Sequence, residues 1–459
     1  MHASVQVAIR RFATATNLSI PGRGFDAPPG PLADVLRAMG GRIRDDGVAF
    51  ADTPQPGRIT VTPTAVHAPD GSVLNGPHTP ASARIAWART HMPLTSRPID
   101  GVAGLRIGLA LVLEPKTAVL ALRLAEAGAD VRVYGHPDET RPEVAAALRD
   151  AGIPVHTGPP GEHSRPAAPP EAARDFLSQR LHLLVDDGAH LIRWAHAVDG
   201  ALEEMIGASE ETTSGITRLR AAGRELRIPV IAANDARAKT LFDNAYGTGQ
   251  SCLTTILDLL DPDAMGWPLW QARVAVAGYG DVGRGFAKLT AALGGTVAVA
   301  DPDPVRLLQA RMDGHNVGEL TALARDADLL VSASGAADTV SLEVLHALPD
   351  GAAIAVAGGV DQEVATAHAE ATGAIWRPFS PAVENLIFPD GRHVQVLDRG
   401  GCINCTAGEG NPIEIMDLSF GVQLAAVAHL LHDPLPPGLH RLPREADDAV
   451  AAAALAAWR

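Results

Sequence analysis

The stretch RVAVAGYGDVGRG, residues 273–285, decides the fold of this chain. Its first five residues predict a buried strand, and a helix is expected to begin at Gly283. Gly278 permits a tight turn, Gly280 lets the backbone approach a pyrophosphate, and Gly283 lets helix and strand pack closely. A helix N-terminus here offers free N–H groups and a positive dipole end to phosphates. The pattern therefore predicts a Rossmann domain that binds a dinucleotide.

Asp301 ends the next predicted strand and is placed to accept hydrogen bonds from ribose hydroxyls. A carboxylate there repels a 2′-phosphate, so NAD is expected rather than NADP, and Arg306 slightly weakens that preference. The alternative is a glycine turn that holds no ligand. The residues expected to bind the cofactor in this domain are Gly278, Gly280, Asp281, Val282, Gly283, Asp301, Arg306, Ser334 and Gly335.

Strands alternate with helical segments on both sides of residues 273–285, which predicts an α/β chain with two doubly wound parallel sheets. We expect a substrate-binding domain at 79–245, completed by 412–459, and a Rossmann NAD-binding domain at 246–411. Residues 1–78 are rich in Pro, Gly and Ala with little periodicity, and we interpret them as a partly ordered extension. The other expected strands are 105–113, 130–134, 181–187, 296–301, 327–334, 352–358 and 393–397.

The composition narrows the class of protein. A chain of 459 residues is too long for one ordinary core. The formal charge of −15 argues against nucleic acid and anionic membrane surfaces as partners. We find no apolar stretch suited to a signal peptide and no uncharged apolar run of about 18 residues, so the cytoplasm is the expected compartment.

Four segments match the S-adenosylhomocysteine hydrolase family in order, and the chain resembles a divergent member of that family over roughly 80–445. In that family, bound NAD oxidises the ribose 3′-hydroxyl to a ketone, which acidifies the C4′–H. A base removes that proton, the 5′ substituent leaves, water adds, and the ketone is reduced again. The resemblance implies NAD, a small nucleoside substrate and a homo-oligomer, dimer or tetramer. The segments are VDDG (185–188), SEETTSGITRLR (209–220), PVIAANDARAKTLFDNAYGTGQS (229–251) and VAGYGDVGRG (276–285).

The resemblance also assigns catalytic roles. Lys239 and Asp243 flank the 3′-hydroxyl and assist its deprotonation, although a lysine acts as a base only if its pKa is lowered. Glu211 contacts the ribose, and Asp187 is a candidate for proton handling near the 4′ and 5′ positions. Alternatively, Asp187 caps a helix, and Lys239 with Asp243 is a surface i,i+4 ion pair. The remaining assignments are Thr212, Thr213 and Ser214 to ribose and NAD, and Asn244 and Asn404 to the nicotinamide end.

The chain departs from the family pattern around the 5′ side and the base. Val112 stands on an active-site histidine, Glu114 on a threonine and Lys116 on a base-contacting acidic or amide position, and only Thr117 survives. Lys116 could instead indicate a ligand with a carboxylate or phosphate. Two further family histidines are replaced by Gly359 and Asn411, and we expect no counterpart of the family's C-terminal tail. The residues expected to bind the substrate are Glu114, Lys116, Thr117, Thr212 and Asn411.

These losses are selective, because the residues for NAD and 3′ oxidation are kept. We therefore predict an NAD-dependent hydrolase or lyase that acts on a nucleoside with altered chemistry at the 5′ side. Dehydration to a 4′,5′-alkene or epimerisation at C4′ would need only the retained residues and a proton donor, such as Glu114 or Lys116. Three alternatives stay open: hydrolysis of S-adenosylhomocysteine, net nucleoside dehydrogenation, and a non-catalytic NAD-binding regulator.

Cys402-Ile-Asn-Cys405 is a CxxC motif, which is typical of redox pairs and of half a zinc site. The chain has only three cysteines and no second CxxC. By resemblance the segment is the loop that holds the nicotinamide, so we expect no metal.

Overall fold

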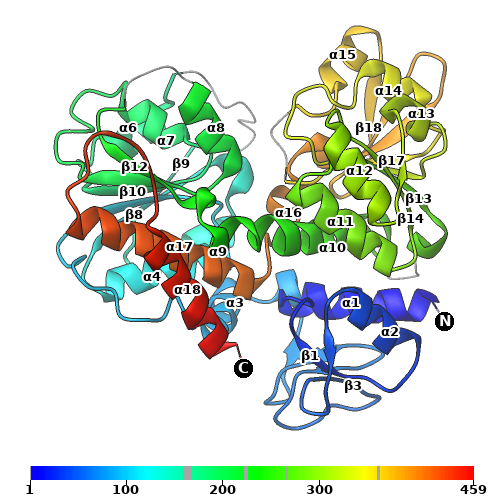
Figure 1. Cartoon of the computed structure of the whole chain (residues 1–459), viewed down its shortest axis with the longest axis horizontal. Helices are drawn as coiled ribbons and strands as arrows, with labels where there is room; N and C mark the ends of the chain where they lie inside the picture. The colour runs from blue at the N-terminus through cyan, green and yellow to red at the C-terminus, as the bar shows by residue number, and fades with distance from the viewer. Residues whose placement is uncertain (1, 159–167, 222–225, 264–266, 359–361, 459) are drawn as a thin grey trace. The chain divides into compact units, whose positions relative to one another are not determined.

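The chain consists of two units, each assembled from separate stretches of sequence (Figure 1). The computed structural model describes residues 2–158, 168–221, 226–263, 267–358 and 362–458. Unit 1 comprises residues 1–78 and 244–412, and unit 2 comprises residues 79–243 and 413–459. The junctions lie within two residues of the expected ones, and residues 1–78 group with the dinucleotide-binding stretch.

Unit 1 contains an eight-stranded sheet of order β15-β14-β13-β16-β17-β20-β19-β18. Its strands are parallel except that β19 runs antiparallel to both of its neighbours. The strand order reverses between β13 and β16, and ligands of such sheets bind at this switch point, beyond the carboxyl ends of the strands. The bounds are β13 (Arg273–Ala277), β14 (Thr296–Ala300), β15 (Asn316–Val317), β16 (Leu329–Ser332), β17 (Ala353–Val356), β18 (Ile375–Ser380), β19 (Val383–Ile387) and β20 (His393–Leu397).

Helix α11 begins at Asp281, two residues before the expected Gly283. Gly280 is its N-cap, so Gly283 lies within the first turn. A Cβ at Gly283 would come within 2.0 Å of the Gly278 carbonyl oxygen, so the glycine lets this turn pack on the strand. The helices of this part of unit 1 are α10 (Gly249–Leu260), α11 (Asp281–Ala292), α12 (Pro304–Met312), α13 (Leu320–Ala324), α14 (Leu342–Ala347), α15 (Thr366–Ala371) and α16 (Ile403–Thr406).

The N-terminal segment is folded, so the expectation of a partly ordered extension is wrong. Its six strands form one sheet of order β2-β1-β3-β4-β5-β6. Each strand has only two or three residues, too few to show the alternation by which strands are recognised in sequence. Phe12 and Phe25 are fully buried and meet edge to face in its core. The bounds are α1 (His2–Thr16), β1 (Gly24–Asp26), α2 (Pro31–Ala38), β2 (Arg42–Ile43), β3 (Val48–Phe50), β4 (Thr60–Val61), β5 (Val66–His67) and β6 (Val73–Leu74).

Helix α1 packs on α10 through a buried arginine. Arg10 Nε lies 2.7 Å from Asp258 Oδ1, and its Nη1 donates to Asp261 Oδ2 at 3.0 Å. Thr14 Oγ1 also donates to Asp258, at 2.7 Å. These contacts join the N-terminal segment to the dinucleotide-binding part of unit 1.

Unit 2 contains a seven-stranded parallel sheet of order β21-β12-β11-β10-β7-β8-β9. Its order reverses between β7 and β10, which gives a second switch point. The C-terminal stretch adds the edge strand β21. The strands are β7 (Arg106–Ala110), β8 (Asp130–Gly135), β9 (Val155–Thr157), β10 (Leu183–Asp186), β11 (Gly207–Glu210), β12 (Pro229–Ala232) and β21 (Gly438–Arg441). The helices are α3 (Ala81–Thr90), α4 (Pro115–Glu126), α5 (Pro142–Asp150), α6 (Glu171–Leu177), α7 (His190–Ala195), α8 (Thr213–Ala221), α9 (Arg237–Thr240), α17 (Ile413–His432) and α18 (Arg444–Ala457).

Helix α17 is long and apolar enough to cross a membrane by length and composition alone, with a mean hydropathy of 1.3. However, 72% of its most apolar window is buried inside the protein. It packs on β11, α9 and α18 of unit 2. A helix that is apolar on most sides is expected in the core of a large domain, and α17 has that position.

Candidate active site

The turn after β13 has the geometry that a pyrophosphate requires. Gly278 adopts φ +98°, and a Cβ there would lie 2.7 Å from the Ala333 carbonyl oxygen. Gly280 is the N-cap of α11 and has no side chain that could cap the first N–H groups of the helix. A Cβ on Gly280 would meet only Arg306 Nη1, at 4.0 Å. The space in front of Gly280 is therefore open; Asp281 is exposed and Val282 is half-buried. This arrangement fits the phosphates of a dinucleotide.

Asp301 is held rigidly at the end of β14. Its Oδ2 accepts a hydrogen bond from Tyr279 N at 2.7 Å, and its Oδ1 accepts one from Asp303 N at 2.8 Å. Arg306 Nη1 lies 3.7 Å from Oδ2. Each carboxylate oxygen can accept a second hydrogen bond, so the position suits a ribose diol.

The loop after β16 forms the other side of this switch point and carries Ser334 and Gly335. The buried Glu363 carboxylate accepts hydrogen bonds from Ser334 Oγ at 2.9 Å and from Gly335 N at 3.1 Å. It also accepts one from the Ser332 hydroxyl. Glu363 therefore fixes the loop, a role that no sequence pattern indicated.

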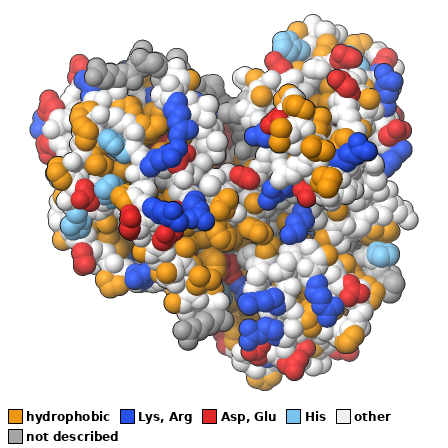
Figure 2. Space-filling view, viewed as in Figure 1, with side chains coloured by type: hydrophobic (Ala, Val, Ile, Leu, Met, Phe, Trp, Pro, Cys, Tyr) orange, Lys and Arg blue, Asp and Glu red, His pale blue; other side chains and the backbone are white. Residues whose placement is uncertain are grey.

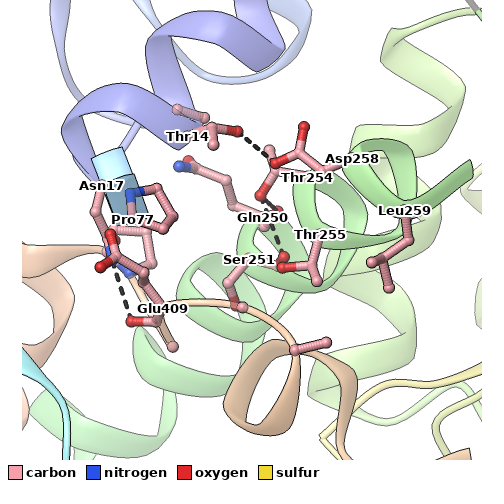
Figure 3. A pocket seen from close by; sticks show the side chains of 15 residues that line it. Thr14, Asn17, Pro77, Gln250, Ser251, Thr254, Thr255, Asp258, Leu259 and Glu409 are labelled. Carbon is pink, nitrogen blue, oxygen red and sulfur yellow. Dashed lines mark hydrogen bonds between the residues drawn. The ribbon is translucent and has the colours of Figure 1, made fainter. Parts of the chain in front are cut away.

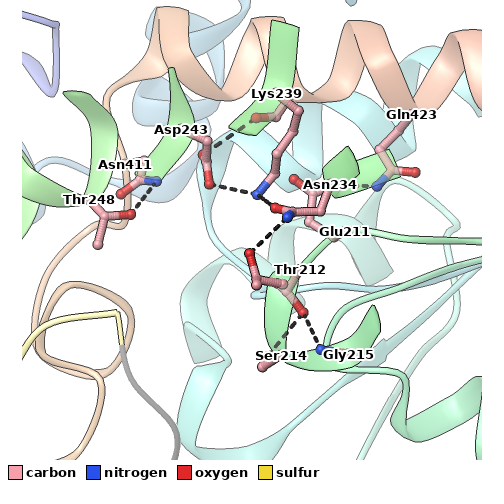
Figure 4. A network of polar contacts seen from close by, with 12 residues as sticks. Glu211, Thr212, Ser214, Gly215, Asn234, Lys239, Asp243, Thr248, Asn411 and Gln423 are labelled. Carbon is pink, nitrogen blue, oxygen red and sulfur yellow. Dashed lines mark hydrogen bonds and ion pairs between the residues drawn. The ribbon is translucent and has the colours of Figure 1, made fainter. Parts of the chain in front are cut away.

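Asn411, expected to bind substrate, lies in unit 1 within a buried polar cluster. Its Oδ1 accepts hydrogen bonds from Ser251 Oγ at 2.8 Å and from Asn404 Nδ2 at 3.1 Å. Its Nδ2 donates to Thr248 Oγ1 at 3.1 Å (Figure 4). An amide does not titrate, so Asn411 cannot transfer protons as a histidine can, and it orients Asn404 instead. Asn244 is half-buried in the π-helical segment Asp243–Thr248.

A hollow of unit 1 lies beside this cluster (Figure 3). It is bordered by α1, by α10 and by residues 407–410 and 412. Asn17 Nδ2 donates to the Glu409 carbonyl oxygen at 3.1 Å, so the N-terminal segment also contacts the loop that carries Asn404 and Asn411. None of the residues predicted from the sequence to bind substrate or cofactor lines this hollow.

In unit 2, Lys239 forms a buried cluster with two partners (Figure 4). Its Nζ donates to Asp243 Oδ2 at 2.8 Å and to Asn234 Oδ1 at 3.0 Å. Lys239 is 2% exposed, which excludes the alternative of a surface ion pair. Within the described residues, these bonds use two of the three ammonium hydrogens and leave one for a ligand.

The charge state of Lys239 follows from its surroundings. Burial lowers the pKa of Lys239, but the carboxylates of Asp243 and Glu211 outweigh burial and hold that pKa above its usual value. The condition for a lysine base, a lowered pKa, is therefore not met in this state. Lys239 is an ammonium that can stabilise a developing alkoxide.

Glu211 is the titratable group at neutral pH. Burial raises the pKa of Glu211 to about 7, against the opposing charge of Lys239. Its Oε2 accepts a hydrogen bond from Gln423 Nε2 of α17. Its other oxygen, Oε1, is buried and has no hydrogen-bond partner among the residues that the structure describes. Because an unsatisfied buried oxygen is costly, Oε1 points to a missing ligand.

Two consecutive acidic residues stand at the end of β10 (Asp186 and Asp187) and at the end of β11 (Glu210 and Glu211). Because successive side chains of a strand point to opposite faces, the two members of each pair have different roles. Asp186 Oδ2 accepts a hydrogen bond from Ile192 N of α7, so Asp186 performs the capping that had been the alternative for Asp187. Glu210 accepts hydrogen bonds from the backbone N–H groups of residues 188, 189 and 212. Burial raises the pKa of both Asp186 and Glu210. Asp187, which follows β10, is half-buried.

The three hydroxyl residues that follow Glu211, namely Thr212, Thr213 and Ser214, take part in a network of hydrogen bonds. Thr212 Oγ1 donates to Glu210 Oε1 at 2.7 Å and lies 3.2 Å from Ser214 Oγ. Thr213 Oγ1 accepts a hydrogen bond from Asn234 Nδ2 at 2.8 Å, which links this turn to the Lys239 cluster. All three hydroxyl residues belong to unit 2.

Glu114 and Lys116 form a buried ion pair after β7. Lys116 Nζ lies 2.7 Å from Glu114 Oε2, and the two residues are 1% and 4% exposed. Glu114 also caps α4 by accepting from Lys116 N at 3.0 Å. Thr117 Oγ1 donates to the Val112 carbonyl oxygen at 2.6 Å. The charge of Lys116 is therefore already balanced, which argues against an anionic ligand group at this position.

The strand order explains how the residues of unit 2 come together. The carboxyl ends of β12, β11, β10 and β7 lie side by side at one edge of the sheet. Sequence reasoning missed Gln423 and Asn234, which hold Glu211 and Lys239. Gln423 had one signal, as a polar residue in a mostly apolar helical run.

The remaining sequence expectations concern metals and charge. No group of three or more His, Cys, Asp or Glu side chains suited to a metal occurs among the described residues. Gly359 lies outside the described residues. Acidic and basic side chains both occur over each unit on the face shown in Figure 2.

Comparisons with known proteins identify the family of this chain. The family model described as S-adenosyl-L-homocysteine hydrolase, NAD binding domain, matches residues 247–410. An adenosylhomocysteinase from Thermotoga maritima is 37% identical over 380 residues, which cover 80% of this chain and 92% of that protein. An S-inosyl-L-homocysteine hydrolase from Methanopyrus kandleri is 37% identical over 387 residues, covering 80% of this chain and 88% of that protein. The chain therefore belongs to the S-adenosyl-L-homocysteine hydrolase family, with NAD as its cofactor.

Proposed function

We propose that this enzyme transiently oxidises the 3′-hydroxyl of an adenosine-like nucleoside and then performs elimination or addition at C4′–C5′, or epimerisation at C4′. The observation that carries the proposal is the buried cluster of Lys239, Asp243 and Glu211, in which Glu211 Oε1 has no partner among the described residues. Bound NAD supplies the hydride acceptor for the oxidation and the hydride donor for the final reduction.

The cluster suits the handling of a sugar hydroxyl. Lys239 keeps one ammonium hydrogen for the 3′-oxygen and stabilises the negative charge that develops on it. Asp243 and Asn234 fix the ammonium group in position. Glu211 accepts the hydroxyl proton, because its pKa of about 7 leaves it partly ionised at neutral pH.

Asp187 is our candidate for the C4′ proton. It follows β10, the strand between those that lead to Glu211 and to the Glu114–Lys116 pair. After the C4′ proton next to the ketone has moved to Asp187, the protonated Asp187 can return that proton to the 5′ oxygen, which leaves as water and gives a 4′,5′-alkene. Returning that proton to the opposite face gives the C4′ epimer with no net change in composition.

The altered 5′ chemistry is supported by the residues that replace the family histidines. Val112 is apolar, and Asn411 is an amide engaged with Ser251, Thr248 and Asn404. Neither side chain can donate a proton to a leaving group.

A second candidate is hydrolysis of an S-nucleosylhomocysteine. The relatives named adenosylhomocysteinase and S-inosyl-L-homocysteine hydrolase favour it, because they align over about nine-tenths of their own length. The two other candidate functions are net dehydrogenation of a nucleoside and a non-catalytic regulatory role. We also propose a homo-oligomer, dimer or tetramer, in the cytoplasm.

One experiment separates these functions. The NAD-loaded protein is incubated in deuterated water with adenosine, inosine and their S-homocysteine derivatives, and Lys239→Met is the inactive control. Deuterium at C4′ of recovered nucleoside shows that C4′–H is removed next to the ketone. A product lighter by one water indicates dehydration, and an isomer of the substrate that carries deuterium at C4′ and separates by chromatography indicates epimerisation. Homocysteine release indicates hydrolysis, and accumulating NADH indicates a dehydrogenase. Absence of exchange and of product with every nucleoside would overturn the proposal.

A further inference from the structure

The CxxC segment places two thiols on either side of Asn404. Cys402 Sγ lies 3.6 Å from Cys405 Sγ, and both residues are half-buried. Both are reduced in the structure. The third cysteine, Cys252, is fully buried. Cys402 and Cys405 therefore form a partly accessible dithiol, and Cys252 is shielded from solvent.

The backbone already has the geometry of a disulfide-bonded turn. Cys405 N donates to the Cys402 carbonyl oxygen at 2.9 Å, as in a four-residue turn. Such a turn holds its terminal Cα atoms within about 7 Å, and disulfides span roughly 4.4–6.8 Å. Because the sulfurs need approach by only about 1.5 Å to reach a bond of about 2.05 Å, side-chain rotation is sufficient.

The Cys402 thiol also orients Asn404. Cys402 Sγ donates to Asn404 Oδ1 at 3.2 Å, while Asn404 Nδ2 donates to Asn411 Oδ1 at 3.1 Å. These two bonds define which way the Asn404 amide points. A disulfide has no thiol hydrogen, so its formation removes the donor to Oδ1.

We propose that Cys402 and Cys405 form a reversible disulfide by exchange with low-molecular-weight disulfides, and that this weakens the hold of Asn404 on the nicotinamide end of NAD. The effect on NAD rests on the proposed role of Asn404. In the exchange, one cysteine thiolate attacks the small disulfide and releases one thiol, and the second cysteine then displaces the other. One small disulfide is reduced to two thiols while the dithiol loses two electrons and two protons. Transient disulfides of this kind act as redox sensors in reducing compartments.

The first measurement is of the disulfide itself. The NAD-free full-length protein is equilibrated with oxidised glutathione, and intact mass and peptide mapping are recorded. We expect the loss of two hydrogens, mapped to a Cys402–Cys405 link, with Cys252→Ala oxidised to the same extent. A persistent glutathione adduct, or links between chains only, would overturn the proposal.

The second measurement is the affinity for NAD, by calorimetry, in reduced and oxidised protein. A thiol is a weak donor, so we expect its loss to raise the Kd about threefold. Cys402→Ala should show the weaker affinity without any oxidant. Cys402→Ser keeps a hydrogen-bond donor at residue 402 and cannot form the disulfide. It should therefore bind NAD with the Kd of the reduced parent, with or without oxidant. The same Kd is expected for Cys405→Ala, which also cannot form the disulfide.

These readouts are independent of turnover. If the link forms but the Kd stays constant, the coupling to Asn404 is refuted. If the Kd responds as expected and no nucleoside reacts, the redox proposal stands and the proposed function fails.

Discussion

Replacing Glu211 by Gln removes the buried carboxyl whose ionisation we expect to control both stability and the first chemical step. Glutamine has nearly the same shape and can still contact Gln423, so the change is chiefly one of charge. The pKa of Glu211 rises from its ordinary 4.5 to about 7 through burial. That rise corresponds to roughly 3 kcal/mol in favour of the protonated side chain in the folded protein.

The sign of the pH dependence follows from this rise. The folded chain binds the Glu211 proton more tightly than the unfolded chain does. Its contribution to stability is therefore fully present below about pH 4.5 and is lost as the pH rises to about 7. Above pH 7 the folded protein carries the whole cost of a buried carboxylate. Glu211→Gln should match the parent near pH 4 and exceed it by up to about 3 kcal/mol at pH 8.5.

The assay is urea unfolding of the NAD-free parent and variant at both pH values. Glu171→Gln, at an exposed glutamate of unit 2, is the control for loss of one carboxylate. In parallel, the rate at which adenosine or inosine reduces bound NAD should rise with pH through about 7 in the parent. It should be about 10²-fold lower and flat in the variant. Equal stability differences at both pH values, together with a parent-like rate profile in the variant, would refute our assignment of Glu211.

Three further predictions concern unit 1. Gly280→Ala should weaken NAD binding at least tenfold in calorimetry and leave the thermal stability of the NAD-free protein unchanged. Gly283→Ala should also lower the Tm, because its Cβ would clash with backbone at 2.0 Å. Arg10→Ala leaves the buried carboxylate of Asp261 without its arginine partner and should cost about 3–5 kcal/mol in denaturant unfolding, and a cost below about 1 kcal/mol would contradict the contacts seen. Asp301→Asn removes the negative charge beside the ribose and should narrow the preference for NAD over NADP, measured as the ratio of the two Kd values.

The sequence predicted strands that are continuous apolar runs and missed strands that lack such a run, whether at the edge of a sheet or inside it. Strands such as β13 and β17 are continuous apolar runs, because helices or loops cover both of their faces. Strand β11 is Gly-Ala-Ser-Glu and β21 is Gly-Leu-His-Arg, and neither shows an apolar run or alternation. Both form because an adjacent strand offers unpaired backbone groups, which is a property of the fold and not of the segment.

The site residues could likewise be predicted only in part from the sequence. Resemblance identified Lys239, Asp243 and Glu211, and the structure brings these three together in one buried cluster. The charge of Lys239 could not be predicted, because it depends on carboxylates that β11 and the segment after α9 bring close to it. Gln423 lies 212 residues from Glu211 in sequence, and no local pattern relates the two.

The interleaved course of the chain has a consequence for its synthesis. Arg10 of α1 contacts Asp261, which is translated 251 residues later. The N-terminal segment can therefore pack on α10 only after α10 has been synthesised. The sheet of unit 2 is completed later, because its edge strand β21 is translated after its partner β12 and after the whole of unit 1. Helix α17, which delivers Gln423 to Glu211, is also a late product. A nascent chain is therefore expected to assemble its dinucleotide-binding fold before it can complete the sheet that carries Lys239 and Glu211.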